Sequence, residues 1–156
     1  MTISEQQIQT DLLGAGIIRA VALMSLVAMV AICHIYAEQI QFAYELQDRV
    51  VLRTILYVAA IFSFPLMKFV RHVLVRLNQT SKTDKSAKSR YLFTISISML
   101  VCASIGLYGL LMYVLGDSFN TLYIFVGLSA LAMFLYRPNK DEYLSIVQAL
   151  EDLSNS

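Results

Sequence analysis

The four long apolar runs of this sequence contain no acidic residue. Neither Asp nor Glu occurs within residues 14–36, 50–68, 91–115 or 121–136. Transporters that couple to protons or sodium usually carry an ionisable side chain at membrane depth, because the coupling charge needs a carrier there. The sequence therefore argues against transport coupled through a carboxylate.

Residues that could hold a metal or exchange disulfides are equally scarce. The two cysteines, Cys33 and Cys102, lie in separate apolar runs, and the two histidines, His34 and His72, are also far apart. A thiol–disulfide motif needs closely spaced cysteines, and a zinc site needs several ligands with suitable spacing. The sequence predicts no catalytic, cofactor-binding or metal-binding site, and hence a protein that is not an enzyme.

His34 is the strongest single candidate for a cofactor ligand, because ionisable residues inside a span are often functional. His72 is predicted at the opposite end of its own span, at least ~25 Å away along the membrane normal, so the two cannot share one haem. A symmetric pair of His34 residues across a homodimer is one alternative. The second alternative, which we expect, is a neutral His34 that is hydrogen-bonded to Tyr36, to the backbone or to water.

Apolar residues, in contrast, are abundant. Of 156 residues, 58% are hydrophobic and 15% are charged, with a mean hydropathy of +0.64. In soluble domains about 45–50% of the residues are apolar and about 25% are charged. A spanning helix needs about 20 mostly apolar residues. We predict one all-α domain, an integral membrane four-helix bundle of two hairpins, with spans at about 14–36, 50–68, 91–115 and 121–136.

Two segments are predicted outside these spans. The apolar pattern continues past Lys68 into the basic connection 69–90, so the second helix should emerge from the membrane with an apolar stripe. After Pro138, residues from about 140 to 153 form a short amphipathic helix. Its apolar face contains Ile146, Val147, Leu150 and Leu153. Its exterior is acidic, unlike that of helices that lie on membranes, so we expect it to dock on protein, either the basic end of span two or a partner.

The distribution of charge predicts an orientation. Residues 68–90 contain seven Lys or Arg residues and one acid, Asp84, whereas the connections 37–49 and 116–120 are mainly acidic. Lys and Arg are retained on the cytoplasmic side. We therefore predict cytoplasmic N- and C-termini in a bacterial inner membrane and no nucleic-acid partner. A basic cluster beside the membrane attracts anionic lipid headgroups, and we assign that role to Lys68, Arg71 and Arg76.

Span three carries small or hydroxyl-bearing residues every four positions. These are Thr94, Ser98, Cys102 and Gly106. Small residues at this spacing let helices approach closely, and hydroxyls can hydrogen-bond across the contact. The row predicts either packing inside the bundle or docking of a partner helix.

The leading functional hypothesis is a small non-catalytic accessory or assembly subunit in a hetero-oligomer with other membrane protein subunits. It follows from the small size, the absence of charged chemistry inside the spans and the tail suited to protein. The alternative is a small homo-oligomeric transporter or channel with a polar path lined by Ser96, Ser98, Ser104 and Ser129. A membrane enzyme or haem subunit is disfavoured by the number of ligands.

Overall fold

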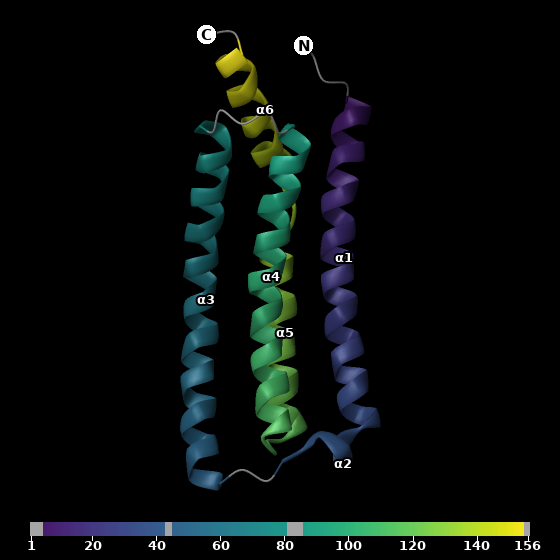
Figure 1. Ribbon diagram of the computed structural model, residues 1–156, viewed down its shortest axis with the longest axis vertical. Coiled ribbons are helices and arrows are strands. Elements are labelled where there is room, and N and C mark those ends of the chain that lie inside the picture. Colours follow the sequence, from purple (N-terminus) through teal and green to yellow (C-terminus); the bar gives the residue numbers. More distant parts are fainter. Residues whose placement is uncertain (1–4, 43–44, 81–85, 155–156) are drawn as a thin grey trace.

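The computed structural model describes residues 5–42, 45–80 and 86–154, and within these ranges the regular structure is entirely helical. The predicted all-α fold is therefore confirmed. The helices, shown in Figure 1, are α1 (Glu5–Ile35), α2 (Ala37–Ile40), α3 (Leu46–Thr80), α4 (Ala87–Val114), α5 (Phe119–Leu135) and α6 (Lys140–Ser154).

Three of these helices, α1, α3 and α4, are long and apolar enough to cross a membrane. The pair α5 and α6 would form a fourth span if counted together, although the two helices meet at a bend of 49°. Helix α5 alone has 17 residues, about 25 Å at 1.5 Å per residue, slightly less than a hydrocarbon core of about 30 Å. These lengths and compositions indicate a membrane protein.

Helices α1 and α3 extend beyond the predicted spans. The first begins at Glu5 rather than near Gly14, and its added turns pack Ile8 and Asp11 into the protein. Helix α3 continues through Pro65 to Thr80. The predicted helical continuation beyond Lys68 is thus present, and the α3–α4 connection is shorter than the expected segment 69–90.

Helix α4 is the central helix of the bundle. It packs against α1, α3, α5 and α6, whereas α1 and α3 flank it and make little contact with each other (Figure 1). In the most apolar stretch of α4, 44% of the residues are buried, compared with 11% in each of α1 and α3. The core therefore follows α4 and α5, and the outer faces of α1 and α3 carry no protein cover.

The tight turn between α4 and α5 depends on Gly116, whose φ of +83° lies in the left-handed region. Its N–H donates to the carbonyl of Tyr113, and the N–H of Asp117 donates to that of Met112, both at 3.0 Å. This pair of bonds ends a helix when the residue after it is left-handed. A Cβ at Gly116 would also lie 2.9 Å from the carbonyl oxygen of Phe42. Conformation and space both favour glycine here.

Candidate functional site

Polar side chains gather inside the bundle where α5 ends and α6 begins. Pro138 has no N–H and cannot continue α5, and the side chain of Asn139 accepts a hydrogen bond from the N–H of Asp141 at 3.1 Å, at the start of α6. The break leaves the carbonyls of Tyr136 and Arg137 without donors from their own helix. The site is built around these two carbonyls.

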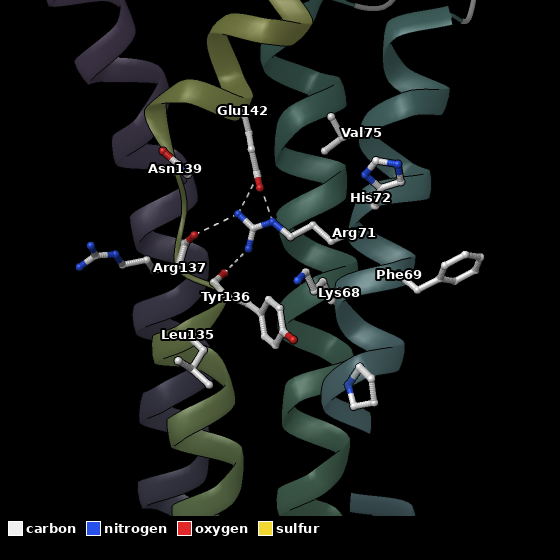
Figure 2. A pocket seen from close by; sticks show the side chains of 11 residues that line it. Lys68, Phe69, Arg71, His72, Val75, Leu135, Tyr136, Arg137, Asn139 and Glu142 are labelled. Atoms are coloured by element: carbon white, nitrogen blue, oxygen red, sulfur yellow. Dashed lines mark hydrogen bonds and ion pairs between the residues drawn. The ribbon is translucent and has the colours of Figure 1, made fainter. Parts of the chain in front are cut away.

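Arg71 of α3 provides the missing donors, as Figure 2 shows. Its guanidinium donates to the carbonyls of Tyr136 at 2.5 Å and Arg137 at 3.0 Å. Two further N–H groups donate to one carboxylate oxygen of Glu142 in α6, at 2.7 and 2.9 Å. Arg71 is only 6% exposed, so these are charge-assisted bonds in a shielded place. The Arg71–Glu142 pair fixes the α5–α6 break to α3.

A cavity of about 700 Å³ opens beside the Arg71–Glu142 pair, between α3 and the α5–α6 break. Its walls combine apolar side chains such as Phe69 and Leu135 with the cationic or titratable side chains of Lys68 and His72. Arg71 is buried and already bonded, whereas Lys68 and His72 are exposed. The cavity thus presents apolar walls and exposed polar groups, an environment that suits an amphiphile.

Helices α1 and α4 join the same region through a second set of bonds. The hydroxyl of Tyr143 donates to one oxygen of Asp11 at 2.7 Å, and the ammonium of Lys88 lies 2.9 Å from the other oxygen. The hydroxyl of Tyr91 donates to the carbonyl of Asn139 at 3.0 Å and accepts from its N–H at 2.8 Å. We call these groups, with the Arg71–Glu142 pair, the inner polar layer. It attaches α6 and its entry to α1, α3 and α4.

The apolar face predicted for the tail helix docks on the chain itself. Ile146 and Val147 are buried and Leu150 is half-buried, while the side chain of Leu153 lies outside the described residues. The helix packs mainly against α3 and α4. Sequence reasoning missed the hydroxyl of Tyr143, because its partner Asp11 is far away in the chain.

The three predicted headgroup ligands differ in their surroundings. Lys68 and Arg76 are exposed, and lipid binding by these two stays a prediction. Arg71 is buried and directs its donors to Glu142 and to two carbonyls. Its geometry favours a structural role over the predicted headgroup contact, since few of its donors are left for a lipid.

The row on span three lies inside the bundle. Thr94, Ser98, Cys102 and Gly106 are all buried. Thr94 accepts a hydrogen bond from the side-chain amide of Asn78 at 2.7 Å. A Cβ at Gly106 would meet side chains of α1 and α5. The geometry thus matches the first of the two interpretations, packing within the chain.

Within a single chain, the four serines proposed to line a polar path lie in different surroundings. Ser98 and Ser129 are buried and donate to the carbonyls of Thr94 at 2.8 Å and Cys102 at 2.7 Å. Ser104 is half-buried and donates to its own helix, and Ser96 is exposed. Within one chain these hydroxyls are used by helix packing and backbone bonds.

At the opposite end of the bundle, both ring nitrogens of His34 have neighbours. Nδ1 lies 3.0 Å from the carbonyl of Val30, and Nε2 lies 2.8 Å from the hydroxyl of Tyr123. The ring also lies 4.5 Å from that of Phe119, centroid to centroid. The backbone contact was among the predicted ones, but the tyrosine partner is Tyr123 rather than Tyr36. Among the described residues, no three His, Cys, Asp or Glu side chains are grouped to hold a metal ion.

No family model, no curated protein and no solved structure matches this chain. The geometry described above is therefore the basis on which a function can be argued. The buried polar groups of the inner polar layer join helices of the chain to one another. The outer faces of the bundle are broad and apolar.

Proposed function

We propose that the protein is a small non-catalytic accessory or assembly subunit of a larger membrane complex, held in a hetero-oligomer with other membrane subunits. The buried polar side chains of Arg71, Ser98 and Ser129 support this proposal, since their hydrogen bonds are made within the chain. A protein whose interior serves packing acts on others through its outer surface.

The observation that carries the proposal is the outer face of α1. Gly16 and Ala20 are exposed four residues apart, and a Cβ at Gly16 would meet no atom within 4 Å. Ala31, also exposed, follows Ala20 by three helical turns and shares this face, with the larger exposed side chains of Met24 and Val27 between them. Small residues four apart, such as Gly16 and Ala20, let a second helix approach closely. In α4 the small residues of the buried row already serve this purpose within the chain.

A substitution of Gly16 tests whether a partner helix uses this face. Gly16→Ile should reduce recovery of the partner when the protein is gently extracted from native membranes, because the side chain would hold the two backbones apart. The matched control is Gly127→Ile. Gly127 is also exposed with no atom near its Cβ position, but Tyr123 and Leu131, four residues to either side, are large.

Native mass measurement of the extracted protein decides between the functional alternatives. A stable heteromer that is lost in Gly16→Ile and kept in Gly127→Ile supports the accessory subunit. A homo-oligomer would favour the transporter or channel instead. A heteromer that both variants keep unchanged would remove the α1 face from the proposal.

We further propose that the α6 end of the bundle faces the cytoplasm of a bacterial cell. The start of α1, the end of α3, the start of α4 and α6 lie together at that end (Figure 1), and the basic residues Arg71, Arg76 and Lys88 belong to these helix ends. Ser86 is exposed there. A Ser86→Cys variant without Cys33 and Cys102 should resist membrane-impermeant thiol reagents in intact cells. Labelling from outside would reverse the orientation.

A further inference from the structure

Two arginines outside the inner polar layer lie near the same aromatic ring. The guanidinium carbon of Arg19 lies 5.7 Å from the ring centroid of Phe134, and that of Arg137 lies 6.0 Å from it. Arg19 belongs to α1, Phe134 to the last turn of α5, and Arg137 to the α5–α6 break. Both cations are within the range of cation–π attraction.

Neither guanidinium has an anionic partner in the described part of the chain. The ion pairs of Arg53 with Asp117, Arg71 with Glu142 and Lys88 with Asp11 involve other cations. The Nε of Arg19 is shielded and has no hydrogen-bond acceptor among the described residues. Figure 2 shows the side chain of Arg137 turned away from the Arg71–Glu142 pair. Two like charges beside one ring repel each other, so an anion bound between them would stabilise the arrangement.

The height of the two arginines along the bundle selects the kind of anion. They meet at Phe134, immediately before the polar break between α5 and α6, and the apolar side chains of Phe134 and of the next residue, Leu135, are strongly exposed. This is the boundary between apolar helix surface and polar protein. In a membrane, long cationic side chains extend to this boundary, where the phosphates of lipids lie.

We propose that Arg19 and Arg137 together bind the phosphodiester group of one anionic phospholipid, whose acyl chains lie against the apolar surface beside Phe134. The planar fork of a guanidinium matches phosphate oxygens with two donors at once. A phosphodiester carries the same single charge and pair of charged oxygens as a carboxylate, and we favour it here because the two guanidiniums lie at the apolar–polar boundary where lipid phosphates lie. The site lies where α1 meets α5, apart from Lys68 and Arg76 on α3, and it does not depend on the proposed accessory function.

The test uses the full chain in detergent, titrated with phosphatidylglycerol and separately with phosphatidylcholine, with bound lipids counted by native mass spectrometry. The unsubstituted protein should retain one phosphatidylglycerol more tightly than phosphatidylcholine, whose choline cation opposes the arginines. Arg19→Gln and Arg137→Gln should each weaken phosphatidylglycerol binding by about tenfold or more, because each removes a charge-assisted bond. Arg53→Gln, which removes a charge near the start of α3 at the opposite end of the bundle, should leave this binding unchanged.

Arg19→Lys protects the test against a folding defect, because it keeps the charge and should retain part of the lipid preference. The proposal is overturned if the double glutamine variant binds phosphatidylglycerol as the unsubstituted protein does, or if both lipids bind that protein equally. Displacement of the lipid by inorganic phosphate at similar concentration would indicate a soluble anion instead. If the double variant keeps the lipid but loses a partner in native membranes, the counter-ion is a carboxylate of that partner.

Discussion

The two hairpins of this chain are packed to very different degrees. Helices α4 and α5 lie along each other so closely that a Cβ at Gly109 would be 2.8 Å from the Cβ of Phe125. Helices α1 and α3 lie on separate flanks of α4 and hardly touch. The connections explain the difference. Residues 115–118 form a tight turn, which makes antiparallel neighbours, whereas α1 and α3 are joined by a longer connection that includes α2.

In the open hairpin, polar bonds at the two ends add to the packing of α1 and α3 on α4. In the closed hairpin, close backbone contact holds α4 and α5 together. At the α6 end, Glu142 binds α3 through Arg71, and Tyr143 binds α1 through Asp11. At the other end, the N–H of Phe42 donates to the carbonyl of Val114 at 2.7 Å. Lipid is as apolar as the helix surfaces, so apolar contact alone gives helices little reason to associate there.

Removal of α6 should have the largest effect on the open hairpin. A chain ending at Asn139 loses the buried side chains of Tyr143, Ile146 and Val147 and the bonds to Arg71 and Asp11. Burial of one such side chain contributes about 1.5–3 kcal/mol, so the melting temperature in detergent should fall markedly. The truncated chain should still enter membranes, because insertion depends on the apolarity of each span. A melt identical to that of the full chain would show that α6 does not hold α1 and α3.

A single added methyl group should destabilise the closed hairpin. In Gly109→Ala the new Cβ would lie 2.8 Å from the Cβ of Phe125 and 3.1 Å from the carbonyl oxygen of Leu122, and overpacking of this kind costs about 1–3 kcal/mol. Gly106→Ala should cost less, since the closest atom is the end of the flexible Leu26 side chain. Gly127→Ala is the control.

The control substitution should be neutral or stabilising by up to about 1 kcal/mol, because alanine favours helix and no atom lies near the new Cβ. Thermal melts of the three variants under one detergent condition give the order. Equal stability of Gly109→Ala and Gly127→Ala would show that the contact between α4 and α5 is looser than described.

Gly109 shows how far the sequence could predict this contact. The row from Thr94 to Gly106 has a constant spacing of four residues. Such a row rotates gradually around a helix of 3.6 residues per turn. The contact continues with a step of three, from Gly106 to Gly109. Because steps of three and four alternate along one helix face, Gly109 belongs to the same face as Gly106, and the sequence alone contains this pattern.

The open hairpin and the buried Arg71 could not be predicted in the same way. Apolar residues that face lipid and those that face protein have similar hydropathy, so the pattern cannot tell whether α1 packs on α3. Arg71 stands among other basic residues and resembles part of a solvated face. Its burial depends on Glu142 and on carbonyls freed by the α5–α6 break, which only the folded arrangement brings together.

An intermediate effect is expected from Glu142→Gln, which leaves the charge of Arg71 buried without its partner. Loss of one member of a fully buried pair costs about 3–5 kcal/mol, but Glu142 is 30% exposed, so we expect about 1–2 kcal/mol. Asp141→Asn is the matched control, because Asp141 is exposed in the same first turn of α6. Equal melting temperatures of the two variants would mean that the Arg71–Glu142 pair contributes nothing measurable.

The smallest effect is expected from His34→Gln, at the end of the open hairpin away from α6. His34 and Tyr123 are both exposed, so water can replace their hydrogen bond, and the stability should change by no more than about 0.5 kcal/mol. Tyr113→Phe, at the same end of the bundle, provides a comparison between an exposed and a buried hydrogen bond. Its hydroxyl is buried and donates to the carbonyl of Cys33 at 3.1 Å, so its loss should cost about 1–3 kcal/mol. His34→Gln should also leave the visible absorption spectrum unchanged. A Soret band that disappears in this variant would show that His34 is a haem ligand. The protein would then bind a cofactor, contrary to the interpretation that both hairpins serve packing alone.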